Sequence, residues 1–210
     1  MDPKAEIQLV YIDDVLNELI GQMETVRLVD SIEEYYSVAP LYAIQLGDLA
    51  TLLRSFSKSR QNLSIPDLSD DLTKKLHSVF LSYLPAGQHS YPLKNNIDER
   101  GSFTEFLKTP DRGQVSVNIS KPGITKGNHW HHSKCEKFLV VWGNGVIRLR
   151  RVENDEISEY WVSGEKPEVV DIPAGYAHNI ENVGTSELVT IMWANEPFNP
   201  ERPDTYTERV

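Results

Sequence analysis

The sequence predicts a mostly β protein, a sandwich or barrel of short strands that follows a small helical segment. From Tyr91 onward, short runs of β-branched and aromatic residues alternate with Gly, Pro, Asn and Asp at roughly ten-residue spacing, which is typical of such folds. Before about Pro85, apolar residues recur at three- and four-residue steps, the period of an amphipathic helix. The length of 210 residues suits one large domain, or a small one with an accessory segment.

Three short helices are expected in the front segment. Asp13 or Asp14 can cap the first, and Ser69 precedes the third. A short strand at residues 41–44 is expected between the first two. The apolar stripes are Val15, Leu16, Leu19 and Ile20 in the first helix, Leu46, Leu49, Leu53 and Phe56 in the second, and Leu72, Leu76, Val79, Phe80 and Tyr83 in the third.

The β region is expected to contain seven strands. They are residues 103–107, 115–119, 138–142, 146–150, 157–162, 168–172 and 188–193. Asn144-Gly145, between two of these runs, predicts a two-residue type I′ hairpin. Residues 199–204 contain two prolines and are expected to form an irregular tail.

The bulk composition excludes several classes of protein. A net charge of -10 argues against binding to nucleic acid or to an anionic membrane, because both attract basic patches. No apolar run approaches the ~18 residues of a transmembrane helix. The single cysteine, Cys135, excludes an intramolecular disulfide, and the first residues do not resemble a signal peptide. A cytoplasmic protein is therefore expected.

Three histidines and one glutamate predict a metal site. His129 and His131 are two residues apart, so on a strand they share one face; Glu136 follows, and His178 ends a distant Pro-x-Gly turn. Imidazole nitrogens and a carboxylate suit a divalent transition metal, with zinc expected first and iron, manganese or nickel open. Cys135, inside the motif, is an alternative ligand.

Other polar residues near this motif are candidates for catalysis or substrate binding. Lys126 can bind a phosphate or carry a proton, whereas His132 suits either a solvated turn or a catalytic role. Tyr176 suits either packing at the rim of a barrel or a phenolic acid. Arg100, before the turn-forming Gly101, offers a planar fork for phosphate or carboxylate. An ordinary surface turn is the alternative there.

No dinucleotide-binding motif is present in the sequence. Gly143-Asn-Gly145 lacks a third glycine, and a β-run rather than a helix follows it. Binding of NADPH is therefore not expected from this chain.

The spacing of the four predicted ligands is similar to that of the cupin family. More specifically, residues 81–206, with the segments 98–105 and 121–132, resemble the C-terminal cupin domain of the CapF family of capsule-synthesis enzymes. In that family a short-chain dehydrogenase/reductase domain precedes the cupin, and residues 1–88 resemble the carboxy-terminal lobe of that domain. The resemblance thus implies a reductase remnant at 1–88 and a cupin at 89–210.

The resemblance also implies a reaction. In the family, the cupin epimerises C3 of a UDP-2-acetamido-2,6-dideoxy-4-hexulose, and the reductase then reduces C4 with NADPH. The product, a UDP-6-deoxy-L-talosamine, leads to UDP-N-acetyl-L-fucosamine. This chain is expected to keep at most the epimerase step, on a UDP-sugar, with NADPH used only by full-length family members. Family analogy also implies a homodimer.

A more distant resemblance links residues 100–105 and 127–129 to dTDP-4-keto-6-deoxyglucose 3,5-epimerase, which is metal-free. That resemblance implies that Arg100 and Glu105 orient the nucleotide. The general base must then come from outside the metal ligands, with Lys126, His132 and Tyr176 as candidates. Two other functions stay open at this point: a cupin dioxygenase or phosphosugar isomerase, and a non-catalytic module for sugar binding or assembly.

Overall fold

A computed structural model describes residues 2–24 and 38–210, which form two compact units. One unit comprises residues 1–61 and 66–90, and the other comprises residues 62–65 and 91–210. None of the described helices is long and apolar enough to cross a bilayer.

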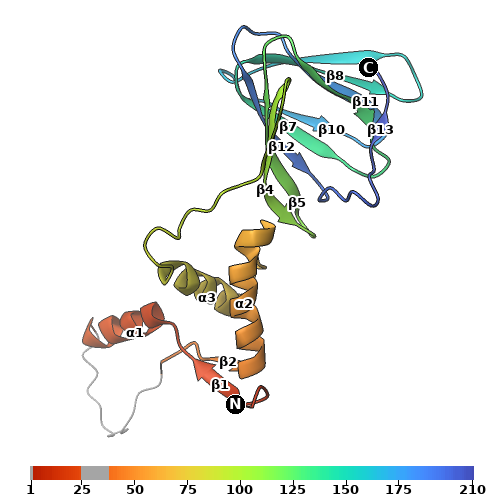
Figure 1. The fold of residues 1–210 in the computed structure, drawn as a ribbon. Helices are drawn as coiled ribbons and strands as arrows, with labels where there is room; N and C mark the ends of the chain where they lie inside the picture. The colour runs from red at the N-terminus through yellow and green to blue at the C-terminus, as the bar shows by residue number, and fades with distance from the viewer. Residues whose placement is uncertain (1, 25–37) are drawn as a thin grey trace, which may run out of the picture. The chain divides into compact units, whose positions relative to one another are not determined.

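In its described residues, the front unit combines a two-stranded sheet with three helices, which can be followed in Figure 1. The strand predicted at residues 41–44 is confirmed, but it begins one residue later, at Tyr42. It pairs antiparallel with residues 6–9, a strand that was not predicted. Asp13 and Asp14 lie in the first turn of α1 and do not precede it, because the helix already begins at Ile12. Asp70 caps α3, where its carboxylate accepts from the Thr73 N–H at 2.7 Å. The elements are β1 (Glu6–Leu9), α1 (Ile12–Glu24), β2 (Tyr42–Gln45), α2 (Leu46–Asn62) and α3 (Asp71–Ser82).

The second unit consists of two antiparallel sheets, so the predicted mostly β architecture is confirmed (Figure 1). The six-stranded sheet has the order β10-β7-β12-β5-β4-β3, and the five-stranded sheet has the order β13-β6-β11-β8-β9. The strands are β3 (Asn95–Asp98), β4 (Gly101–Thr109), β5 (Gly113–Ser120), β6 (Thr125–Trp130), β7 (Glu136–Trp142), β8 (Asn144–Arg151), β9 (Ile157–Ser163), β10 (Val169–Ile172), β11 (Tyr176–Asn182), β12 (Leu188–Ala194) and β13 (Tyr206–Thr207).

A single apolar core joins the two sheets. Phe138 and Leu188 come from the six-stranded sheet, whereas Ile147 and Ile180 come from the five-stranded one, and all four are almost fully buried. Alternating strand residues point to opposite faces of a sheet, so each sheet turns one apolar face to the other. The burial of this shared layer is the main force that holds the sheets together.

The predicted hairpin at Asn144-Gly145 is wrong. Both residues lie inside β8, where Asn144 pairs with Ser163 and Gly145 pairs with Val162 on β9. β7 and β8 belong to different sheets, so the chain crosses between sheets at this point and does not fold back on itself. Gly143 allows the sharp change of direction with a φ of 81°, and a Cβ there would come within 2.5 Å of the Glu187 carbonyl oxygen.

Candidate metal centre

The four predicted metal ligands converge in the β unit. His129 lies in β6, His131 directly follows that strand, Glu136 begins β7 and His178 lies in β11. β6 and β11 are antiparallel neighbours, and their register places His178 opposite His129. One potential ligand atom from each of the four residues lies within 4.8 Å of the other three. The site therefore joins the two sheets.

The backbone around β6 is shaped to bring these side chains together. The pairing of β6 with β11 shifts register between His178 and Asn179, and such a bulge redirects the side chains beside it. Gly127 has a φ of 103°, and a Cβ at this position would come within 2.7 Å of the His178 carbonyl oxygen. Only glycine fits where the two backbones approach so closely.

The arrangement leaves buried polar atoms that a cation would satisfy. His178 and His131 are 1% and 3% exposed. Glu136 Oε2 lies 3.0 Å from His178 Nε2 and 3.5 Å from His131 Nε2, but neither contact has the geometry of a hydrogen bond. Within residues 2–24 and 38–210, these three atoms have no hydrogen-bond partner. Two nitrogens and a carboxylate oxygen facing one point fit a divalent metal ion.

The protonation of the cluster also suits metal binding. Burial, with smaller contributions from His178 and His131, lowers the pKa of His129 to about 4. Burial alone would raise the pKa of Glu136, but the adjacent His131 and His178 hold it below its usual value. Near neutral pH the glutamate is thus an anion and His129 is neutral, the forms in which both bind metals.

Backbone carbonyls fix the tautomers of two ligands. His178 Nδ1 lies 3.2 Å from the Tyr176 carbonyl oxygen, and His131 Nδ1 contacts the carbonyl oxygen of Asp204. A carbonyl can only accept a hydrogen bond, so each ring carries a proton on Nδ1. Each Nε2 lone pair is then free to bind a metal, which is the usual arrangement around metal-binding histidines.

Asp204 is a supporting residue that the sequence analysis missed. Its carboxylate accepts hydrogen bonds from the backbone N–H groups of His132, Ser133 and Lys134 at 2.8–3.0 Å, and from the Ser133 hydroxyl at 3.1 Å. Partial burial would raise the pKa of Asp204, but these N–H donors lower it below its usual value. The predicted irregular tail therefore fastens the loop between His131 and Glu136, a role that no local pattern signals.

The cluster opens into a cavity of about 640 Å³. His129, His131 and Glu136 form part of its wall, and the predicted substrate-binding residue Glu105 also lines it. Glu105 pairs with Lys108 at 2.6 Å. The cluster can thus act on a small molecule that enters this cavity.

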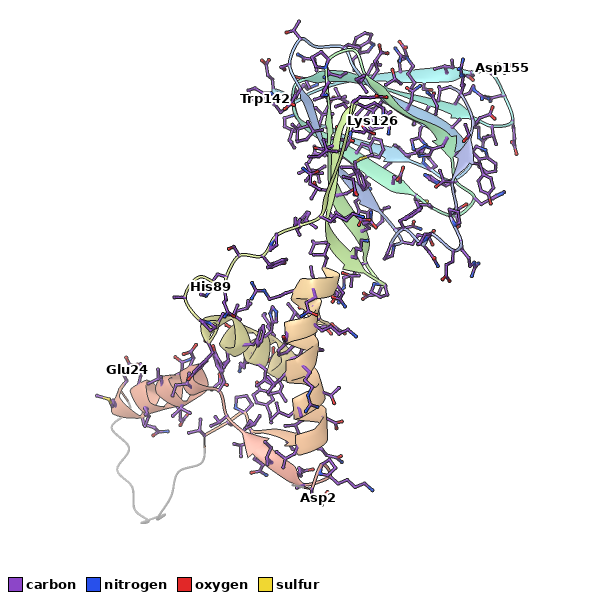
Figure 2. All side chains as sticks on the ribbon, in the orientation of Figure 1. Asp2, Glu24, His89, Lys126, Trp142 and Asp155 are labelled. Atoms are coloured by element: carbon purple, nitrogen blue, oxygen red, sulfur yellow. The ribbon has the colours of Figure 1, made fainter. Side chains whose placement is uncertain are left out.

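Arg100 and Lys126 lie at a smaller neighbouring cavity of about 290 Å³. Asn96 and Phe103 line both cavities. Lys126, labelled in Figure 2, donates to Asn118 Oδ1 and to the Ile119 carbonyl oxygen, each at 2.8 Å, and burial lowers its pKa. Arg100 is held by Asp98 at 2.6 Å. The structure therefore does not place these two cations beside the metal cluster.

The remaining candidates lie outside the lining of both cavities. The His132 ring packs edge-on against the stacked rings of Trp130 and Tyr206, with centroids 4.5 and 4.8 Å away. Tyr176 packs against the apolar core, and its ring lies under the Arg151 guanidinium at 5.7 Å. Cys135 is not part of the four-residue cluster.

Comparisons with known proteins show similarity to polysaccharide synthesis proteins. Residues 96–206 match the family model described as the polysaccharide biosynthesis C-terminal domain. A UDP-2-acetamido-2,6-beta-L-arabino-hexul-4-ose reductase of Pseudomonas aeruginosa is 43% identical over 202 residues, covering 96% of this chain and 54% of the relative. The spore coat polysaccharide biosynthesis protein SpsL of Bacillus subtilis is 27% identical over 122 residues, covering 53% of this chain and 81% of that protein.

A solved structure is similar along the whole chain. The crystal structure of the capsular polysaccharide assembling protein CapF from Staphylococcus aureus superposes with a TM-score of 0.93 at 55% identity, covering 100% of this chain and 56% of that one. The chain thus spans little more than half the length of CapF and of the Pseudomonas relative. The predicted resemblance to the cupin domain of CapF and the predicted cupin-like fold are both confirmed.

Proposed function

Because the chain belongs to the polysaccharide biosynthesis C-terminal domain family, we propose that it acts in capsular polysaccharide synthesis as a metal-dependent epimerase. The proposed reaction inverts C3 of a UDP-2-acetamido-2,6-dideoxy-4-hexulose. The relative in Pseudomonas is named for a closely related keto-sugar, which supports this class of substrate. Reduction of C4 is not proposed for this chain, since its sequence carries no dinucleotide-binding motif.

One observation carries the proposal: three imidazoles and a carboxylate face one point in the wall of a cavity, and three of their atoms lack other partners in the described part of the chain. His129, His131, Glu136 and His178 would hold the ion, with zinc proposed first and iron, manganese or nickel as alternatives. When bound, the metal supplies a Lewis acid for the ketone oxygen of the substrate.

The residues of the chain have separate proposed tasks. Removal of the C3 proton requires a base and a ketone that is held in place and shielded from water. Lys126 and Arg100 supply positive charge in the neighbouring cavity, where we place the diphosphate of the nucleotide. The shared walls Asn96 and Phe103 then let one ligand extend from that cavity to the metal cluster. Glu105, held by Lys108, would orient the sugar end.

Lys126, His132 and Tyr176 are the three candidates for the general base. His132 and Tyr176 lie outside both cavities, and the Lys126 ammonium donates to three oxygens, those of Asn118, Ile119 and Ser102. Glutamine substitutions at Lys126 and His132, and phenylalanine at Tyr176, would each be measured for exchange of the C3 proton. Substitution of the residue that acts as the base would lower the rate of exchange by roughly 10²–10⁴-fold.

The proposed function is tested by incubating the protein with the 4-keto UDP-sugar in heavy water, without NADPH, and following C3 by NMR. Deuterium at C3 is expected with the zinc-loaded protein and is expected to disappear in His129→Ala and His178→Ala. Full metal content and full exchange in both variants would refute the metal-dependent mechanism.

A non-catalytic binding module is the second candidate function. Exposed aromatic residues on β7 and β9, with Trp142 63% and Trp161 67% exposed, favour an additional role in assembly. Tight binding of metal and UDP-sugar without any exchange at C3 would select this function. A homodimer remains a prediction, which sedimentation analysis would test.

A further inference from the structure

A buried lysine without an ionic partner lies in the metal cavity. Lys134 is 7% exposed, and its side chain lines the same cavity as His131 and Glu136. Its ammonium lies over the ring of Phe198, with the ring centroid 5.9 Å away. The Lys134 ammonium is not among the buried polar atoms that lack a partner, so it is open to the water of the cavity. An anionic ligand in the cavity would supply the ionic partner that the described residues do not.

Its position places this charge near the predicted metal ligands. Lys134 precedes Glu136 by two residues, so their Cα atoms are at most roughly 7 Å apart. The backbone N–H of Lys134 is fixed by the Asp204 carboxylate at 3.0 Å. The anchored backbone limits where the ammonium can move. The Phe198 ring, which also lines the cavity, covers one side of the ammonium and leaves its N–H donors for a partner on the open side.

Two other lysines that line these cavities already have polar partners within the protein. Lys108, in the same cavity, is paired with Glu105 at 2.6 Å, and Lys126 in the neighbouring cavity donates to two oxygens at 2.8 Å. A carboxylate thus balances the charge of Lys108, and neutral oxygens accept from Lys126. A purely structural lysine would be expected to have comparable acceptors. Lys134 instead lines the cavity in which the reacting part of the proposed substrate would lie.

We propose that Lys134 is a catalytic residue that binds the oxygen on which negative charge develops when the sugar loses its C3 proton. This inference rests on the proposed function. When a base takes the proton, the electrons of the C3–H bond form a C3–C4 double bond, and the carbonyl π electrons move onto the C4 oxygen. The ammonium donates a hydrogen bond to this oxyanion, and the charge returns to C3 when a proton is delivered to its opposite face.

The first test compares C3 deuterium exchange in Lys134→Met, Lys134→Gln and Lys134→Arg at equal zinc content. Methionine and glutamine keep most of the side-chain length without the charge, and exchange is expected to fall roughly 10²–10³-fold. Arginine restores a cationic donor and is expected to recover part of the rate. Lys166→Met is the matched control, because it removes the same charge from a side chain that is 82% exposed. Unchanged exchange in both uncharged variants overturns the assignment.

The second test needs no turnover. A CapF crystal structure contains the inhibitor 3-isopropenyl-tropolone, and tropolone forms an oxyanion that serves as a probe of the same charge. Its affinity for zinc-loaded protein is expected to weaken roughly 10- to 100-fold in Lys134→Met and Lys134→Gln, but not in Lys166→Met.

The two tests separate the possible failures. Equal tropolone affinity in wild type and in the Lys134 variants contradicts the role of Lys134. Binding of tropolone that depends on Lys134, without deuterium exchange in the wild-type protein, contradicts the proposed epimerase and keeps the anion site. Exchange that survives in the uncharged variants contradicts Lys134 alone.

Discussion

Replacing Asp204 with alanine should weaken the fold and the metal site together. The substitution removes the acceptor for the His132, Ser133 and Lys134 N–H groups and for one hydroxyl. A net hydrogen bond contributes about 0.5–1.5 kcal/mol. Asp204 is half-buried, so water can replace part of each contact, and the low end of that range applies. Four such contacts give a loss of about 2 kcal/mol.

The expected loss is large enough to measure by thermal unfolding. For a chain of this length, about 1 kcal/mol shifts Tm by about 2–4 °C, so Asp204→Ala should lower Tm by about 4–8 °C. Zinc affinity, measured by competition with a chelating dye, should fall roughly 10- to 100-fold, because the loop that carries His131 to Glu136 loses its anchor. Asp155→Ala is the control, since Asp155 lies on an outer turn and is exposed (Figure 2).

The stability that Asp204 contributes should also depend on pH. The three backbone donors outweigh the effect of partial burial and hold the pKa of Asp204 below its usual value of 3.8. A lowered folded pKa contributes stability that is present above the unfolded pKa and is lost as the pH falls through the folded one. The difference between wild type and Asp204→Ala should therefore shrink below about pH 4. Equal Tm and zinc affinity in Asp204→Ala and Asp155→Ala would refute the anchoring role.

Three further predictions follow from the metal cluster and the core. Burial and the neighbouring imidazoles lower the pKa of His129 to about 4 from an ordinary 6.5, so the unfolded chain takes up this proton first. Metal-free protein should lose stability as the pH falls from 6.5 to 4; a flat profile in urea unfolding would contradict this. Glu136→Gln removes the anionic ligand and should weaken zinc binding at least about 100-fold by calorimetry, with unchanged affinity as the refuting result. Ile147→Ala should cost about 2–5 kcal/mol in chemical unfolding, against a small effect for Val169→Ala, because Ile147 is fully buried and Val169 is 56% exposed.

The fold class could be predicted because most strands carry strong local signals. The runs around Phe138, Ile147 and Leu188 are rich in aliphatic, β-branched and aromatic residues, and all three form strands of the core. β6 and β11 were missed because they are rich in polar residues, and β6 also contains Gly127. These two strands carry His129 and His178, so the functional requirement for polar ligands obscured the pattern that would have revealed them.

The pairing of strands that are far apart in the sequence could not be predicted from local sequence patterns. Asn144-Gly145 has the composition of a hairpin, but the composition of a turn does not determine to which sheet the next strand belongs. The grouping of His129, His131, Glu136 and His178 could be predicted because three of them are close in sequence and all four carry side chains that bind metals. Asp204 and Lys134 were missed because their importance comes from a contact across the fold and from burial, neither of which leaves a pattern in the sequence.

The last residues of the chain contribute directly to the proposed active site. Tyr206 and Thr207 pair with Trp130 and His129, and the carboxylate of Asp204 holds the neighbouring loop. An affinity tag or reporter fused directly after Val210 would therefore extend from a segment in contact with the ligand-bearing strand. Proteolytic trimming past Asp204 would remove this support altogether. Purification handles for biochemical work are better attached at the opposite end of the polypeptide.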